Sequence, residues 1–385
     1  MGRRPCACGM HPHARVEEIE GPYGKFAIGE RAIQRLWATH EVQGPLTTLS
    51  GSNLVVICPG DWNRSGGPDF LGAELTINGE RLRGDVEIHL RSEDWNAHGH
   101  QHNPHFNGVI LHAVLLPGAK PIQTSQKHQP ETVVLLPYLP RDLEDLAEED
   151  ALLDLRGRAG DVARRVLSLE PNIAQGLRRR ASERFHAKVH HAQQRIQQQG
   201  WEQACHELCL EALGLGGNRA PMSELAQSYS PQTMMLMGID KLYLEKCGRW
   251  RLRGLRPAGH PYRRLAQYLE LLRRHPQWFQ SIREWSTAEA LLSLQEHRRT
   301  LIDQILTGVI PDGRADTLCI NALLPLTHQK GHSQLEKWLQ WPPGNFPDDL
   351  HEARLRLGLV GASHNWEIQG LLDILRRTAG QPPPT

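Results

Sequence analysis

The hydrophobic pattern of this chain changes near residue 140, and that change limits the folds the chain can adopt. Before it, short apolar runs, several alternating with a period of two, are separated by turn residues, which favours strands. We expect strands at 54–58, 73–77, 83–90, 109–116 and 132–136, after a helix at 30–40. Beyond Pro140 the apolar spacing is helical nearly to the end. The pattern therefore predicts an α/β or α+β N-terminal domain followed by an all-helical C-terminal domain.

Turn-forming residues indicate where these elements begin and end. Asn78-Gly79 between two apolar alternating runs predicts a tight hairpin that joins the second and third strands. The terminal Gly-Gln-Pro-Pro-Pro-Thr predicts a disordered tail. We therefore expect an N-terminal arm at 1–25, an α/β domain at 26–140, a helical domain at 141–380 and a tail at 381–385.

Composition narrows the class of protein. The 385 residues carry 44 Lys and Arg against 43 Asp and Glu, so attraction to an anionic partner must come from local clusters. Seven Cys in so long a chain favour a reducing compartment over a disulfide framework. No apolar run approaches the roughly 20 residues of a membrane span, and no signal-peptide pattern is present. We expect a cytoplasmic protein with no membrane association.

The most chemically informative strand runs from Arg83 to Leu90. Alternation places Asp85, Glu87 and His89 on one face and apolar residues on the other. If the preceding Pro-Asp turn brings Asp69 to the neighbouring strand, carboxylates and an imidazole converge and can bind a divalent cation. The alternative is that Asp85 and Glu87 form only the solvated face of an edge strand.

Histidines follow this strand closely. In an extended loop, His98-Gly99-His100 would place both imidazoles on one side, where they suit Zn²⁺ or proton transfer. We take His98 and His100, with Asp85, as accessory site residues. The alternative is that these histidines are surface or capping residues.

This stretch resembles the core of the restriction-endonuclease-like superfamily. That superfamily has Pro-Asp, a gap, and then Asp or Glu, any residue and Lys; here Pro68-Asp69 and Glu87-Ile88-His89 fit the frame, with His in place of Lys. The resemblance implies a mixed sheet with flanking helices, Asp69 and Glu87 as metal ligands, and His89 in the basic catalytic role. It implies Mg²⁺ or Mn²⁺, and the imidazole makes Zn²⁺ an alternative.

A wider set of motifs is similar to a bacterial family known as domain of unknown function 2851. The motifs include Gly67-Pro68-Asp69-Phe70, Gly84-Asp85-Val86-Glu87-Ile88-His89, Asp94-Trp95, His98-Gly99-His100 and Val109-Ile110-Leu111-His112. Later matches, such as Trp250 and Gln369-Gly370-Leu371-Leu372, extend the resemblance over most of the chain. It implies no established activity.

The helical half contains a basic block between Arg249 and Arg283, with nine Arg, one acid and interleaved aromatic residues. Such a mixture suits a phosphate backbone and exposed bases, although a solvated helix face is the usual explanation of a charge run. The predicted nucleic-acid-binding residues are Trp250, Arg251, Arg253, Arg256, Arg263 and Arg264.

Together these patterns favour a metal-dependent, nuclease-like phosphodiesterase acting on DNA or RNA, with Asp69, Glu87 and His89 as its catalytic residues. A non-catalytic nucleic-acid-binding or assembly protein of the same fold is the main alternative. A Zn²⁺-dependent hydrolase of small substrates is a third hypothesis.

Overall fold

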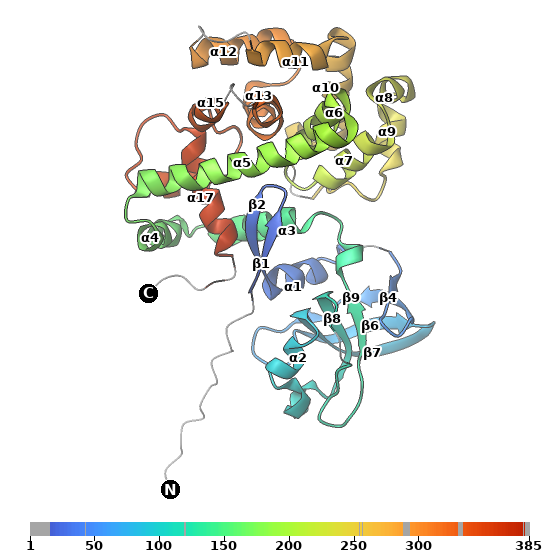
Figure 1. The fold of residues 1–385 in the computed structure, drawn as a ribbon. Coiled ribbons are helices and arrows are strands. Elements are labelled where there is room, and N and C mark those ends of the chain that lie inside the picture. The colour runs from blue at the N-terminus through green and yellow to red at the C-terminus, as the bar shows by residue number, and fades with distance from the viewer. Residues whose placement is uncertain are drawn as a thin grey trace. The chain divides into compact units, whose positions relative to one another are not determined.

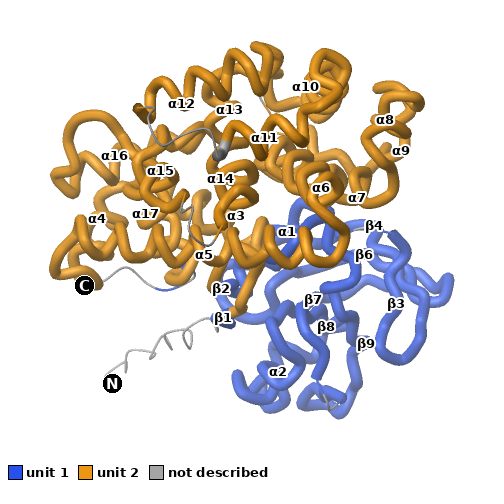
Figure 2. Tube along the Cα trace, turned by 45° about the horizontal axis from the view of Figure 1, so that its top comes forward, with its two compact units in different colours: residues 1–18, 27–143, 379–381 blue, residues 19–26, 144–378, 382–385 orange. Residues whose placement is uncertain are grey.

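The computed structural model describes residues 16–42, 44–118, 121–253, 255, 257–287, 293–329, 334–379 and 381. Its chain forms two compact units (Figure 2). Unit 1 comprises residues 1–18, 27–143 and 379–381, and unit 2 comprises residues 19–26, 144–378 and 382–385. The fold is α+β, with a mixed sheet in the N-terminal part and mostly helices after it, as the sequence predicted (Figure 1).

Unit 1 is organised around a seven-stranded sheet. Its strands are β3 (Leu46–Thr47), β4 (Asn53–Cys58), β5 (Asp61–Trp62), β6 (Phe70–Ile77), β7 (Glu80–Arg91), β8 (Val109–Leu116) and β9 (Glu131–Val134). The spatial order is β3-β4-β6-β7-β8-β9, and β5 pairs with β6. Pairing is antiparallel from β3 to β7 and parallel from β7 to β9, so the sheet is mixed.

The hairpin between β6 and β7 forms where the sequence predicted it. Asn78 and Gly79 both have positive φ angles, 50° and 87°, as a two-residue turn of this kind requires. The antiparallel register that follows pairs Ile77 with Glu80 and Phe70 with Val86. It therefore brings the start of β6 beside the middle of β7, where Glu87 and His89 lie.

The connection from β7 to β8 is a crossover, because parallel neighbours cannot be joined by a tight turn. It contains the short helix α2 (Asp94–Ala97) and the 3₁₀ helices η1 (His100–His102) and η2 (Pro104–Phe106). Topology thus returns the histidine-rich segment to the sheet.

Apolar residues of helix α1 (Glu30–Ala38) and of the sheet form the core of unit 1. Ile33, Leu36 and Trp37 recur at helical spacing and are buried, and α1 packs against β7. Strands β7 and β8 are buried on both faces around Val86–Leu90 and Leu111–Leu115. The 3₁₀ helix η3 (Leu136–Tyr138) follows β9.

The described part of unit 2 is mainly helical. It also contains residues 19–26 of the hairpin formed by β1 (Val16–Gly21) and β2 (Gly24–Gly29). Its first helices are α3 (Leu143–Leu155), α4 (Ala159–Leu169), α5 (Ile173–Gln199), α6 (Trp201–Leu213), α7 (Arg219–Ser228), α8 (Pro231–Met237) and α9 (Ile239–Glu245). The remainder are η4 (Pro257–Gly259), α10 (Pro261–Arg274), α11 (Trp278–Thr287), α12 (Leu294–Thr300), η5 (Leu301–Ile305), α13 (Asp312–Leu318), η6 (Cys319–Leu323), α14 (Leu324–Thr327), α15 (Leu335–Gln340), α16 (Asp348–Arg356) and α17 (Asn365–Arg377). In the described part of the chain, no helix combines the length and apolarity of a membrane span.

Helix α5 is the longest helix of this unit and packs along α17 (Figure 1). The contact is close at Gly370, where an added Cβ would lie 2.5 Å from the carbonyl oxygen of Leu177. A side chain at residue 370 would push the two helices apart. The large apolar core of unit 2 includes Phe185, Leu208, Tyr268, Trp278 and Trp338.

Candidate metal centre

Asp69 and Glu87 are held together by reciprocal backbone hydrogen bonds. The Asp69 amide donates to Oε2 of Glu87 and the Ile88 amide donates to Oδ2 of Asp69, both at 3.0 Å. Gln34, on α1, donates from Nε2 to the other Asp69 oxygen at 2.8 Å. Glu87 lies on an interior strand and is buried, so it does not belong to the solvated face of an edge strand.

Burial makes this group of carboxyls costly to ionise. The pKa of Asp69 is raised to about 8 by burial and by the nearby Glu87 carboxylate. Burial raises the pKa of Glu87 to about 8, and burial together with Asp69, Asp94 and Glu87 raises that of Glu30 to about 8. A bound cation would relieve this penalty, because it would compensate the negative charge of all three groups.

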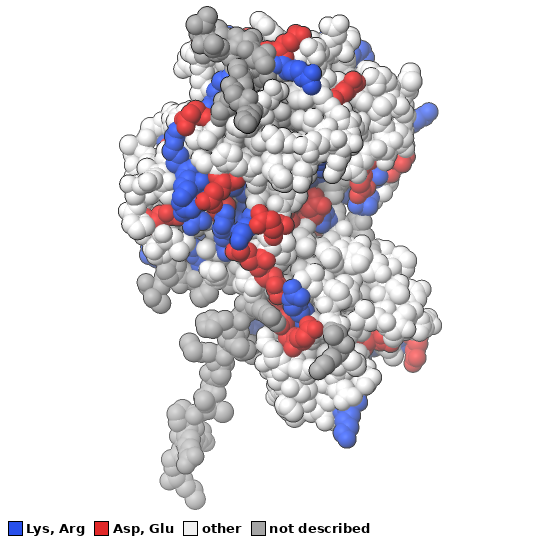
Figure 3. Space-filling model, viewed as in Figure 1, with Lys and Arg blue, Asp and Glu red and all other residues white. Residues whose placement is uncertain are grey.

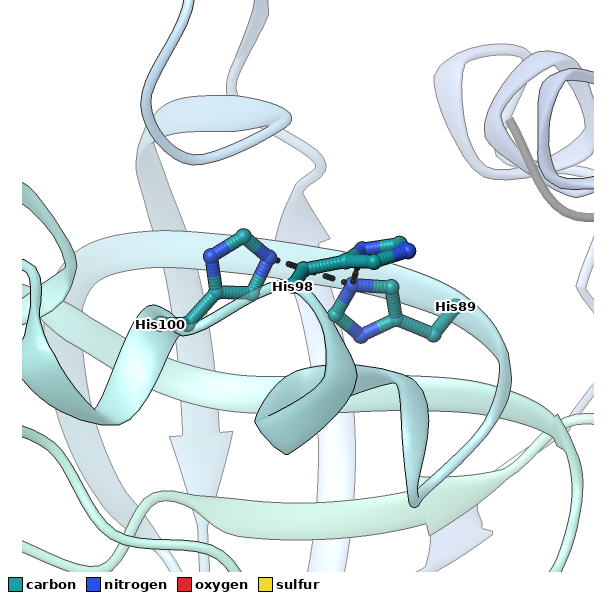
Figure 4. A group of neighbouring side chains, drawn as sticks. All are labelled: His89, His98 and His100. Carbon is teal, nitrogen blue, oxygen red and sulfur yellow. Dashed lines mark hydrogen bonds between the residues drawn. The ribbon is translucent and has the colours of Figure 1, made fainter. Parts of the chain in front are cut away.

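Three imidazoles lie close together next to the carboxyl pair of Asp69 and Glu87, and Figure 4 shows the three rings. Nε2 of His89 lies 3.2 Å from Nδ1 of His98 and 3.3 Å from Nε2 of His100. Oε1 of Glu87 lies 3.4 Å from Nε2 of His89 and 3.1 Å from Nε2 of His100. The three imidazoles therefore cluster around Nε2 of His89, and the Glu87 carboxylate lies beside two of them.

These separations match a four-coordinate metal centre. Metal–nitrogen bonds of about 2.0–2.1 Å at tetrahedral angles place neighbouring donor atoms about 3.3–3.4 Å apart. The ring atoms of His89, His98 and His100 that could serve as ligands all lie within 4.8 Å of one another. The three histidines fit a divalent cation, and Glu87, beside two of them, could supply an oxygen ligand.

A fourth histidine orients the most buried ligand. Nδ1 of His89 lies 2.9 Å from Nε2 of His112, on the neighbouring strand β8. If Nε2 of His89 binds a metal, Nδ1 carries the proton and donates it to His112, as an outer-shell partner does. Burial lowers the pKa of His112 to about 3 and that of His100 to about 4, so both rings are neutral and suited to these roles.

Aromatic packing holds the crossover in place. The rings of His100 and Phe106 stack with centroids 3.8 Å apart, and buried Trp95 meets His100 edge to face. Trp95 donates from Nε1 to the Gln123 carbonyl at 2.9 Å, and Asp94 accepts from the Arg91 amide at 2.9 Å. The Asp94-Trp95 pair anchors the segment that carries the ligands.

Comparison with known proteins places the chain in a family. A family model described as a protein of unknown function, DUF2851, matches residues 30–246, more than half of the chain. The chain belongs to the DUF2851 family. No curated protein and no solved structure gives a significant match.

The DUF2851 match contains the whole donor cluster, since it begins at Glu30 and continues beyond His112. Asp69, Glu87, His89, His98 and His100, all predicted from sequence, lie together in the structure. We expected His98 and His100 in an extended loop, and that expectation is wrong. Gly99 has a left-handed φ of 77° between α2 and η1, and this turn directs both rings toward His89.

Other residues were placed differently or missed. Asp85 accepts from the Gly72 amide at 3.1 Å, away from the three imidazoles. Sequence analysis missed Glu30 and Gln34, although their spacing of four on one helix could have indicated a shared face directed at Asp69.

The predicted nucleic-acid-binding residues of the DUF2851 chain are dispersed between surface and interior. Arg253 and Arg263 are exposed, whereas Arg264 is buried. Arg251 pairs with Glu149, and Trp250 is buried against Tyr243, with ring centroids 5.6 Å apart. Arg256 lies outside the described residues.

Proposed function

We propose that this protein is a metal-dependent phosphodiesterase acting on DNA or RNA. The observation that carries the proposal is the cluster of His89, His98 and His100 at metal-ligand spacing. Glu87 lies beside His89 and His100, and Asp69 lies next to Glu87. A divalent metal at that point would polarise a phosphoryl oxygen and lower the pKa of a bound water.

The order of elements supports the phosphodiester substrate class. Helix α1 is followed by the antiparallel strands β4, β6 and β7 and then by β8, parallel to β7. Asp69 directly precedes β6, and Glu87 and His89 lie within β7. These are the positions at which the restriction-endonuclease-like pattern has its metal-binding and basic residues.

The nitrogen donors affect which metal we expect. Oxygen ligands suit Mg²⁺, whereas imidazoles favour later transition metals. Three imidazoles therefore favour Zn²⁺ over the Mg²⁺ usual for a carboxylate pair, with Mn²⁺ between them in the series we test. The same donor set favours our second candidate function, a Zn²⁺-dependent hydrolase of small substrates.

The proposed ligands differ in their exposure to solvent. His89 is 1% exposed, which suits a ligand, while His98 and His100 are only partly buried and line the side from which a substrate can approach. Asp69 is also partly exposed and is hydrogen-bonded to Glu87, so its carboxylate lies where it could accept a proton from a bound water. We assign proton transfer to Asp69 and metal binding to His89.

Cleavage of labelled DNA, labelled RNA and a small phosphodiester, each in Mg²⁺, Mn²⁺ or Zn²⁺, tests the proposal. We expect His89→Ala to reduce the rate by more than about 100-fold, because even outer-shell partners cost 10- to 100-fold. His105→Ala is the matched control, since His105 lies in the same crossover and is exposed.

The outcomes separate the hypotheses. Metal-dependent cleavage of polynucleotides that is lost in His89→Ala supports the phosphodiesterase. Cleavage of the small substrate alone supports the second candidate. Nucleic-acid binding without turnover of any substrate would support a non-catalytic protein and overturn the proposal.

A further inference from the structure

Unit 2 contains a partly open cavity of about 810 Å³, a size at which proteins bind small organic molecules. Five basic side chains line it, and three acidic ones do so. The basic residues are Arg184, Lys188, Arg219, Arg264 and Arg314. The cavity belongs wholly to unit 2 and is distinct from the metal centre of unit 1.

Three of the arginines each have one buried nitrogen without an acceptor among the described residues. A guanidinium carries five N–H groups. Arg184 donates from Nε to Gln369 at 3.0 Å, and its Nη1 is buried without an acceptor among the described residues. Arg264 donates to Gln267 and to the Ala258 carbonyl. The Nε atoms of Arg264 and Arg314 are buried without a hydrogen-bond acceptor in the described part of the chain.

These three arginines also lack carboxylate partners. Within the described ranges, no acidic side chain forms an ion pair with Arg184, Arg264 or Arg314. Burial, followed by repulsion from Arg314 and Arg263, lowers the pKa of Arg264 to about 10. Burial also lowers the pKa of Arg314. The structure therefore buries positive charge whose counter-charge the chain does not supply.

The acids at the cavity do not fill this deficit. Glu211 accepts hydrogen bonds from Arg219 at 2.8 Å and from Tyr23 at 2.5 Å. Glu148 lies 3.8 Å from Arg376, and Asp348 is exposed. Water could accept the unused hydrogen bonds, but only an anion could also neutralise the charge.

The other lining residues suit the organic part of a small ligand. Leu152, Leu255 and Phe346 provide apolar surface, while the amides of Asn321 and Asn345 provide orienting polar groups. We propose that this cavity binds a small organic molecule through a phosphate group held by Arg184, Arg264 and Arg314. Planar guanidinium groups match phosphate oxygens in geometry and charge.

Isothermal titration of the full-length protein tests the proposal, with inorganic phosphate, adenosine 5′-monophosphate, adenosine and citrate as probes at constant ionic strength. We expect the two phosphates to bind, and adenosine to show no binding. Arg314→Gln should weaken phosphate binding by about tenfold or more, because a charge-assisted hydrogen bond is lost. Arg273→Gln is the matched control: it removes an exposed arginine of the same helix, α10, that does not line the cavity, and it should leave affinity unchanged.

A second variant protects the test against misfolding. Arg264→Lys keeps the charge but loses the planar donor set, so we expect folded protein with weakened phosphate binding. Failure of the parent to bind either phosphate would overturn the proposal, as would equal loss in Arg273→Gln and Arg314→Gln. Preference for citrate would overturn the phosphate assignment. Metal binding at His89 is measured separately, so this result is independent of the proposed phosphodiesterase.

Discussion

The candidate metal centre of unit 1 and the cavity of unit 2 contain buried ionisable groups of opposite kind, carboxyls in the first and guanidinium groups in the second. In unit 1, burial raises the pKa values of Glu30, Asp69 and Glu87 to about 8. In unit 2, burial and neighbouring arginines lower the pKa of Arg264 to about 10. Each shift disfavours the charged form, and each would be reversed by an external partner: a cation in the first case and an anion in the second.

A third region shows what internal compensation looks like. Glu211 is as buried as Glu87, and burial raises its pKa, yet Arg219 and Arg195 outweigh that effect and bring the value to about 2. Arg219 lies 2.6 Å from Asp145 as well as 2.8 Å from Glu211. Burial alone therefore does not identify a site; the absence of an internal partner does.

Charges on the surface of unit 2 are also compensated by neighbouring charges of opposite sign. On the face of unit 2 seen in Figure 3, basic and acidic side chains are interleaved. Arg179 pairs with Glu183, and Arg356 pairs with Glu352, and all four side chains are exposed. Exposed pairs of this kind contribute little to stability, typically about 0–1 kcal/mol, and they leave little net charge for a polyanion.

The largest effect is expected at the metal ligands. Glu87→Gln should weaken Mn²⁺ or Zn²⁺ binding by more than about 100-fold, yet leave the metal-free protein equally or more stable, because it removes a buried carboxyl. Calorimetric titration and urea unfolding measure the two quantities. Glu80→Gln, at the exposed start of β7, is the control. Unchanged metal affinity in Glu87→Gln would show that the carboxylate is not a ligand.

A smaller loss is expected from the outer shell. His112→Phe keeps an aromatic ring in the core but removes the acceptor for the His89 Nδ1 proton. We expect metal affinity to fall about 10- to 100-fold, with all three imidazole ligands still present. Competition titration with a metal chelator measures the change. An unaltered affinity would assign His112 to packing alone.

A pH effect of intermediate size is expected in unit 2. Buried His206 accepts from the Tyr268 hydroxyl at 2.5 Å and donates to the Tyr229 carbonyl at 3.0 Å. Burial lowers its pKa to about 4, so the unfolded chain takes up a proton first as the pH falls below about 6.5. Stability is therefore present at neutral pH and lost on acidification, by about 2 kcal/mol at pH 5.

Urea unfolding at pH 8 and pH 5 checks this value, with His206→Gln as the comparison. The variant should lose less stability than the parent between the two pH values. If the parent and the variant have the same pH dependence, His206 does not carry the effect.

The smallest effect concerns nucleic acid. Replacing Arg253 and Arg263 together by Gln should flatten the salt dependence of duplex binding by at most about two units, near 0.9 per lost phosphate contact. Fluorescence anisotropy over a salt series measures the slope, and metal binding serves as the control. An unchanged slope would remove this surface from the proposed nucleic-acid contact.

Much of unit 1 could be predicted from its sequence. Strands β4, β6, β7 and β8 and helix α1 fall where periodicity placed them, and the Asn78-Gly79 turn fixes the register of the hairpin. That register brings Asp69 beside Glu87, as the pattern predicted. Local rules suffice here because strands joined by a two-residue turn leave few alternative pairings.

The remaining features depend on contacts between distant segments. The meeting of His89 with His98 and His112 depends on a crossover whose path periodicity does not encode. Runs of basic residues in the sequence did not show whether their charges are compensated, because the acidic partners come from far along the chain. Arg178, for example, pairs with Glu336. Trp250 seemed suited to stacking on a base by composition, but its indole packs against Tyr243.

The central claim is that unit 1 binds one divalent cation through three imidazoles and Glu87. X-ray absorption at the zinc edge, on the full-length chain loaded with one equivalent of Zn²⁺, tests it most directly. The account predicts three imidazole nitrogens and one oxygen at about 2.0–2.1 Å, and loss of this spectrum in His89→Ala but not in His105→Ala. A spectrum of oxygen ligands alone, or one unchanged in His89→Ala, would contradict it.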